Sequence, residues 1–441
     1  MHSILNKVKT ILSDKDNNEI AGKSSISFLL KIGSFITNYG LVFICTYYSG
    51  AKGWGLFAIC FSLTRLVGLF CTFGFPNSIV KFFADHELDR RYFLKIAMLI
   101  TVPFSVIVSL IIYSFSEEVA SIFNEVDDDL IIAIKLSSAA IVPFAISLVV
   151  SGFYRAIKNM SQYHFFETIG RQLFTLIIYL IWVQVQNEDY VSIFSFLIAN
   201  WILMLIGLVL IAVQLRKNAG GNNTVTVRQI LSVSTSLHIS KFVNYGVISS
   251  TVFILGIFVD RSLVGIYDAC YRVANFSSIA LLAVNSISAS KFAEFSSPQN
   301  INKLRKNLRF SGAIVFWVSI PVILFIAIFS YWILGIFGDS FIYGQIALLI
   351  LLAGQLVNNL AGSVGMMMQM TGMHIQFRNI NIAVFVMIIV LNFGMIPILG
   401  INGAAFAVTL GLIIKNFTSV YLVYRSKGIS SFYLPSIKFF K

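Results

Sequence analysis

Long apolar stretches alternate with short polar segments along the whole chain. Most of these stretches reach about 20 residues, the length that an α-helix needs to cross the hydrocarbon core of a bilayer. A transmembrane β-barrel would instead show shorter segments of alternating hydrophobicity. We therefore expect an all-α protein that passes through the membrane many times.

The pattern predicts twelve transmembrane helices, with a thirteenth helix lying on the membrane surface. The surface helix is expected over residues 1–12, where apolar side chains recur along one helical face. The approximate ranges of the spans are 24–48, 53–75, 93–115, 129–152, 163–186, 190–214, 232–258, 262–290, 310–335, 341–370, 377–399 and 401–424.

Basic residues are distributed very unevenly between the two sets of loops. One set, together with both termini, holds 23 of the 32 lysines and arginines, and the other holds only Lys52 and Arg261. The positive-inside rule then places the N- and C-termini in the cytoplasm. The opposite set of loops is acidic and includes Glu125 and Asp127.

Composition supports this assignment. Of the 441 residues 57% are hydrophobic and 12% charged, about half the charged fraction of a soluble domain. The net charge of +13 reflects the basic cytoplasmic loops, so we expect no nucleic acid partner. All four cysteines lie within apolar spans and are expected to be small core residues.

Short motifs recur in the two halves of the chain. Asn38-Tyr39-Gly40 reappears as Asn244-Tyr245-Gly246, 206 residues later, and Gly55-Leu56-Phe57 is similar to Gly265-Ile266-Tyr267, 210 residues later. Six spans per half would make both halves enter the membrane in the same direction. This is a parallel repeat related by a pseudo-twofold axis along the membrane normal. We predict an N-terminal lobe at 1–215, a cytoplasmic linker at 216–231 and a C-terminal lobe at 232–441.

Several cations lie deep within the predicted spans, where ionisable groups are costly and normally face a cavity or a partner. Lys135 is close to a span end and is expected to reach the outer surface. The remaining cations are Lys31, Arg65, Arg171, Lys241, Arg272 and Lys415.

Two of these cations have an acid one helical turn away. Asp268 can pair with Arg272 and Glu167 with Arg171, and a purely structural role for both pairs is the alternative interpretation. The other cations have no local acid, so positive charge is in excess within the spans. Such a cavity suits a phosphate or diphosphate group, because arginine offers paired donors to phosphate oxygens and lysine a point charge.

Other polar residues within the spans leave two interpretations open. His238, one turn before Lys241, is either a packed polar group or part of a proton relay. The side-chain amides are expected to bond between helices, with contacts to a sugar as the alternative. They are Asn244, Asn275, Asn285, Gln355, Asn358, Asn359 and Gln369.

The chain shows neither a nucleotide-binding loop nor a metalloprotease motif, and no credible acid–base pair. We therefore predict that it is not an enzyme, with no catalytic residues, metal site or cofactor. Coupling to a proton or sodium gradient is expected instead, with Asp268 and His238 as the candidate groups.

Several motifs resemble those of Wzx-type polysaccharide repeat-unit flippases, within the multidrug/oligosaccharidyl-lipid/polysaccharide (MOP) exporter superfamily. VGIYDACYRVA at 264–274 is similar to the family's eighth-helix pattern, and GINGAA at 400–405 to the entry of its last helix. FGFPNS at 73–78 and QMTG at 369–372 match the ends of its second and tenth helices. The drug-exporting branch carries an acid in its first helix that is missing from 24–48.

The resemblance implies a flippase that carries undecaprenyl-diphosphate-linked oligosaccharide between the leaflets of the bacterial inner membrane, for O-antigen or a related polysaccharide. Essential cations of the related lipid II flippases lie in helices one, two and eight, which here contain Lys31, Arg65 and Arg272. Membrane lipid, a polysaccharide polymerase and a chain-length regulator are the implied partners of a monomeric protein. The alternatives are a membrane-embedded glycosyltransferase or polymerase, and a secondary exporter of small organic molecules.

Overall fold

A computed structural model describes residues 15–83, 90–186, 188–217 and 226–433. Within these ranges the side chains of residues 15–29, 31, 216–217, 236–237, 240–241, 244 and 298 are not described. The predicted surface helix at 1–12 lies outside the described residues.

The described part of the chain is helical. The α-helices are α2 (Lys15–Cys71), α3 (Phe75–Phe82), α4 (Arg90–Ser114), α5 (Ser116–Ala120), α6 (Asp128–Ala156), α7 (Met160–His164), α8 (Gly170–Trp182), α9 (Val191–Lys217), α10 (Val227–Phe258), α11 (Arg261–Phe276), α12 (Ile279–Glu294), α13 (Ile301–Ile328), α14 (Ser330–Gly335), α15 (Gln345–Ala361), α16 (Val364–Met370), α17 (His374–Leu399) and α18 (Ile401–Lys427). A π-helical turn η1 (Phe165–Ile169) joins α7 to α8, and 3-10 turns η2 (Pro298–Asn300) and η3 (Asp339–Gly344) precede α13 and α15.

The helices confirm a multi-pass membrane protein. Among the described residues, nine helices are long and apolar enough to cross a bilayer, or ten if α11 and α12 form one bent span. One of the nine, Ile32–Cys71, covers most of the first two predicted spans, and the seventh appears only as the shorter apolar helix Tyr245–Phe258. The count of twelve therefore stays a prediction.

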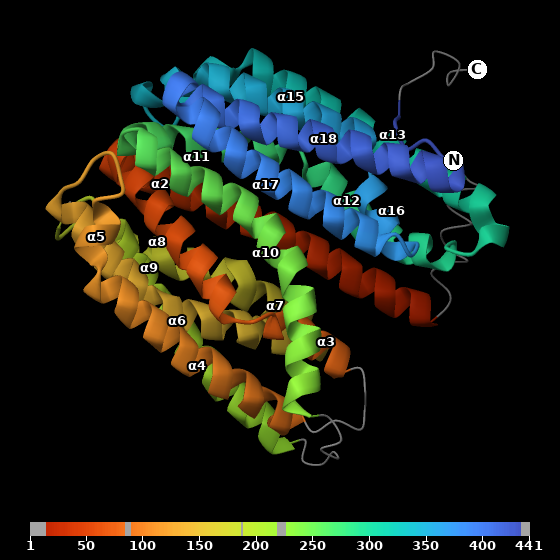
Figure 1. Cartoon of the computed structure of the whole chain (residues 1–441), viewed down its shortest axis with the longest axis horizontal. Helices are drawn as coiled ribbons and strands as arrows, with labels where there is room; N and C mark the ends of the chain where they lie inside the picture. The colour runs from red at the N-terminus through yellow and green to blue at the C-terminus, as the bar shows by residue number, and fades with distance from the viewer. Residues whose placement is uncertain (1–14, 84–89, 187, 218–225, 434–441) are drawn as a thin grey trace.

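Gly50 divides α2 into two helical parts. Its backbone angles, φ 62° and ψ −163°, are not helical and belong to a region that is essentially restricted to glycine. The break falls between the first and second predicted spans, and the two parts of α2 diverge from it (Figure 1). A single glycine thus lets two membrane-length helices follow one another without a loop.

The helices form two groups that α2 and α10 connect (Figure 1). One group contains α4, α6, α8 and α9, and the other contains α13, α15, α17 and α18. Helix α2 packs against α6 and α8 on one side and against α10 and α11 on the other. Helix α10 packs against α3 and also against α17.

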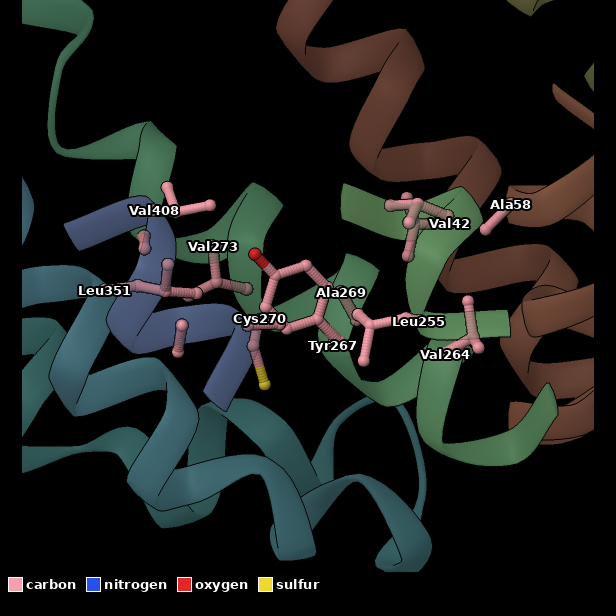
Figure 2. Packing of buried hydrophobic residues seen from close by; sticks show 14 of the residues in the cluster. Val42, Ala58, Leu255, Val264, Tyr267, Ala269, Cys270, Val273, Leu351 and Val408 are labelled. Atoms are coloured by element: carbon pink, nitrogen blue, oxygen red, sulfur yellow. The ribbon is translucent and has the colours of Figure 1, made fainter. Parts of the chain in front are cut away.

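Helix α11 is buried between the two groups. Figure 2 shows Val264 on the side of α11 that faces α2, near Ala58, and Val273 on the side that faces Leu351 and Val408. The eighth predicted span, 262–290, is not one straight helix, because α11 and α12 meet at 49°. The four cysteines, Cys270 of α11 included, are buried as predicted.

Two glycines let α11 approach α2 at backbone distance. A Cβ atom on Gly55 would lie 1.8 Å from the Arg261 carbonyl oxygen, and a Cβ on Gly265 would lie 2.2 Å from the Ala51 carbonyl oxygen. Both glycines belong to the motif that is repeated in the two halves, so the two copies of the motif contact each other. Small residues at such a crossing maximise van der Waals contact, a main source of helix association in lipid.

We predict that Gly265→Ala destabilises the protein. The new methyl group has no space beside the backbone of α2, and overpacking of this kind costs about 1–3 kcal/mol. Thermal unfolding of the purified protein in detergent should show a lower midpoint. Gly394→Ala is the matched control, because nothing lies within 4 Å of a Cβ at Gly394; equal midpoints for the two variants would contradict the packing described for Gly265.

Candidate functional site

A cavity of about 490 Å³ lies where α2, α8 and α11 meet. Side chains from α6, α7, η1, α9, α10 and α12 complete its wall. Its charged lining residues among those described are Arg65, Arg171, Arg272, Glu167 and Asp268. Three of the six cations predicted from the sequence therefore line one cavity, although they are distant in the chain.

Arg65 of α2 has neither an ion pair nor a side-chain hydrogen bond among the described residues. Aromatic rings support it instead, with the Tyr245 ring centroid 4.3 Å and the Phe61 centroid 5.8 Å from the guanidinium carbon. Ring faces attract a cation but leave its N–H groups without acceptors. The donors of Arg65 therefore remain available to a guest in the cavity.

Arg171 of α8 is held in place more tightly. Its Nε donates to the Asn200 side chain at 3.0 Å, its Nη1 donates to the backbone carbonyl of Glu167 at 3.0 Å, and its guanidinium carbon lies 4.2 Å from the centroid of Phe144. Its Nη2 is buried without a hydrogen-bond acceptor among the described residues. The π-helical turn η1 directly before α8 carries Glu167, and such turns are frequent at functional sites.

Arg272 of α11 is paired within the protein. Its Nε lies 2.6 Å from Asp268 Oδ2, as the i, i+4 spacing predicts, and its Nη1 donates to Asn38. The indole N–H of Trp54 donates to the same Asp268 oxygen at 3.1 Å, and the Trp54 ring lies 5.2 Å from the guanidinium carbon. The carboxylate thus holds the position next to Arg272 that a phosphate oxygen would need.

The two central arginines each contact a tyrosine from the other half of the chain. Arg272 follows Arg65 by 207 residues, close to the offsets of 206 and 210 between the repeated motifs. Tyr39, in the first copy of the NYG motif, donates its hydroxyl to the backbone carbonyl of Arg272. Tyr245, in the second copy, packs its ring on Arg65. Each half therefore supplies a tyrosine to the arginine of the other half.

The other predicted site residues lie elsewhere. Lys415 of α18 lines a second cavity of about 130 Å³, which shares Tyr271 and Ile248 with the first. His238 of α10 packs near Gly74 and does not line either cavity. Lys31 lies in α2 and Lys241 in α10, and the side chains of both are outside the described part of the structure.

Several residues of the site were not predicted from the sequence. Trp54 has no sequence feature that marks it, because a buried tryptophan is common in any apolar helix. The sequence marks Asn38 and Tyr245 only as members of the repeated motif, and not as site residues. Gln172, one residue after Arg171 and a hydrogen-bond partner of Asn38, could have been found as a polar residue next to a buried cation.

A charged cluster away from the cavity joins α11 and α2 to the segment between α5 and α6. Arg261, at the start of α11 and with its side chain only 2% exposed, contacts Glu125 and Asp127 in the segment between α5 and α6. Lys52 lies 3.4 Å from Glu125 and 3.7 Å from Asp127. The sequence predicts all four residues on the outer side of the membrane, and the structure brings them into contact.

The helices and the cationic cavity define a polytopic membrane protein with the fold of MOP superfamily transporters. A solved MOP superfamily transporter from Pyrococcus furiosus, whose description reports a binding pocket of reverse polarity, is similar with a TM-score of 0.63 and 14% identity over 93% of this chain and 95% of that one. The MATE multidrug transporter DinF-BH is similar with a TM-score of 0.67 and 13% identity over 94% of this chain and 96% of that one.

The chain belongs to the polysaccharide biosynthesis protein family, whose model matches residues 20–292. It is also 29% identical over 173 residues to the probable flippase AglR of Haloferax volcanii. The matched stretch covers 38% of this chain and only 36% of that protein. The structural similarity confirms the predicted fold, and the family match agrees with the predicted role in polysaccharide biosynthesis.

We predict that the Arg261 cluster stabilises the protein near neutral pH and loses this effect in acid. Burial opposes ionisation of Glu125 and Asp127, but the hydrogen bonds and charge of Arg261 outweigh it and hold the pKa of each carboxyl below its usual value. A lowered pKa means stabilisation that is present above the usual carboxyl pKa, about 4, and is lost as the pH falls through the lowered value.

Thermal unfolding of the wild type and of a Glu125→Gln/Asp127→Asn variant between pH 7 and pH 3 tests this. The wild type should have the higher midpoint at pH 7, and the difference should disappear toward pH 3. A difference that is constant over this range would contradict the electrostatic role of the cluster.

Proposed function

We propose that this protein is a flippase that moves undecaprenyl-diphosphate-linked oligosaccharide repeat units from the cytoplasmic to the outer leaflet of a bacterial inner membrane. The observation that carries the proposal is the convergence of Arg65, Arg171 and Arg272 on one cavity, with Arg65 free of any acid among the described residues. Among the described lining residues three guanidinium groups face two carboxyl groups, and the excess of positive charge favours an anionic guest. The family match supports a role in polysaccharide biosynthesis.

Each cation has a proposed role in holding the diphosphate. Arg65 makes the first contact, because its donors are available, and Arg272 follows by exchanging Asp268 for a phosphate oxygen. Arg171 supports from α8 with its remaining Nη2 donor. Lys31 and Lys241 complete the set, and Lys415 adds positive charge from the second cavity.

The proposed movement is alternating access between two six-helix lobes, at 1–215 and 232–441, joined by a cytoplasmic linker at 216–231. The oligosaccharide crosses within the cavity while the polyprenyl tail stays in lipid. Both termini are cytoplasmic, and the protein acts as a monomer.

Asp268 and His238 are the proposed groups for coupling to a proton or sodium gradient. O-antigen is the proposed polysaccharide, and a polymerase and a chain-length regulator are the proposed partners.

We predict that Arg65→Ala stops translocation. Purified protein would be placed in liposomes with a fluorescent undecaprenyl-diphosphate oligosaccharide, and the fraction open to a membrane-impermeant quencher would be followed. Loss of charge-assisted hydrogen bonds should lower the affinity for the lipid roughly ten- to hundredfold. Arg65→Lys should retain part of the activity, since lysine keeps the charge but not the paired donors.

Lys135→Ala is the matched control, because Lys135 is a cation within a predicted span that does not line the cavity. It should translocate like the wild type. Equal rates for Arg65→Ala and Lys135→Ala would argue against the cationic site. A change in glycan length without movement would favour a polymerase, and movement of small organic molecules alone would favour an exporter.

A further inference from the structure

Asn38 presents an oriented amide donor to the cavity. Its Oδ1 accepts hydrogen bonds from Gln172 Nε2 at 3.0 Å and from Arg272 Nη1, while Gln172 Oε1 accepts from the Thr37 hydroxyl at 3.0 Å. Because two donors fix the position of the oxygen, Nδ2 must point the other way. Asn38 lines the cavity, and its Nδ2 makes no hydrogen bond with the described residues.

A second chain of amides ends at Asn275, on another wall. Asn416 Nδ2 donates to Asn358 Oδ1 at 3.2 Å, Asn358 Nδ2 to Gln355 Oε1 at 3.2 Å, and Gln355 Nε2 to Asn275 Oδ1 at 3.3 Å. The Ser278 hydroxyl also donates to Gln355 Oε1, at 2.7 Å. Every amide in this series is therefore oriented, and Nδ2 of Asn275 is left without a hydrogen-bond partner among the described residues.

Both free donors lie next to Arg272. Asn38 accepts a hydrogen bond from its guanidinium group, and Asn275 follows it by one helical turn on α11. Neutral N–H donors can bind an oxyanion, but the guanidinium groups that line the same cavity compete with them for phosphate oxygens. They are suited to neutral acceptors, such as a hydroxyl or an amide carbonyl, for which a few well-placed polar groups set orientation and specificity.

We propose that Asn38 and Asn275 form a sugar subsite that binds acceptor oxygens of the first sugar, the one attached to the diphosphate. This inference rests on the proposed function. It assigns recognition of the sugar to two amides on different helices. Hydrogen bonds from Gln172 and Arg272 in the cavity wall orient Asn38, and a hydrogen bond from Gln355 behind the wall orients Asn275. A site built to hydrogen-bond a polar substituent discriminates strongly against a substrate that lacks it.

Binding of two lipids to the purified protein in nanodiscs tests the subsite. The probes are undecaprenyl diphosphate without sugar and undecaprenyl diphosphate carrying a single N-acetylhexosamine. Asn38→Leu and Asn275→Leu keep a similar shape and remove the donor. Asn275→Leu should weaken binding of the sugar-bearing lipid roughly three- to tenfold and leave binding of the sugar-free lipid unchanged. Asn38→Leu also removes an acceptor of Arg272, so it should weaken binding of both lipids, and binding of the sugar-bearing lipid by roughly three- to tenfold more.

Two further variants keep the test informative if either substitution in the cavity prevents folding. Gln355→Met removes the donor that orients Asn275 and changes no residue that lines the cavity. It should weaken binding of the sugar-bearing lipid by a smaller factor than Asn275→Leu does. Asn392→Leu is the matched control, because Asn392 donates to the Thr251 hydroxyl and lines neither cavity. It should bind both lipids like the wild type.

The outcomes separate this inference from the proposed function. Equally weakened binding of both lipids would mean that the amides contact phosphate. Unchanged binding of both would mean that the amides only connect helices. Each of these results overturns the sugar subsite. If Arg65→Ala leaves the affinity for both lipids unchanged, the cationic diphosphate site fails instead.

Discussion

Three guanidinium groups lie inside the membrane-spanning part of this protein, and the arrangement around the cavity follows from the need to stabilise them. An unpaired cation away from water is costly unless protein groups replace its hydration shell. Arg171 receives an amide, a backbone carbonyl and an aromatic face, and Arg272 receives a carboxylate, an amide and the Trp54 ring. Arg65 receives aromatic faces alone from the described residues, so it has the strongest remaining demand for an anion.

The repeated motifs explain how two distant parts of the chain build this arrangement. The NYG motif places Tyr39 against the backbone of Arg272 and Tyr245 against the side chain of Arg65. The second motif places Gly55 and Gly265 where α2 and α11 touch. Equivalent residues thus meet their counterparts across the interface between the two halves, and each half contributes to the surroundings of the other half's cation.

The sequence was sufficient for the parts of the site that depend on depth and local spacing. Arg65 and Arg272 could be predicted because cations far from the ends of apolar spans need a cavity, and the Asp268–Arg272 pair because i, i+4 residues share a helix face. Lys415 shows the limit of this reasoning, since depth does not reveal which way a helix is rotated and the side chain lines a neighbouring cavity. Trp54 and Asn38 depend on contacts more than 200 residues apart, for which one sequence carries no signal.

Helix α11 links the cavity mechanically to the charged cluster outside it. Arg261 stands at its first position, and Asp268 and Arg272 follow on the same unbroken helix. A helix that is tightly packed moves as a rigid unit, by small shifts or rotations against its neighbours. A shift of α11 along its axis would therefore change its contacts with Glu125 and Asp127 and also its contacts with Trp54 and Asn38 on α2. The Arg261 cluster and the surroundings of Arg272 are in this way connected through α11, whose first residue contacts the segment between α5 and α6 and whose middle contacts α2.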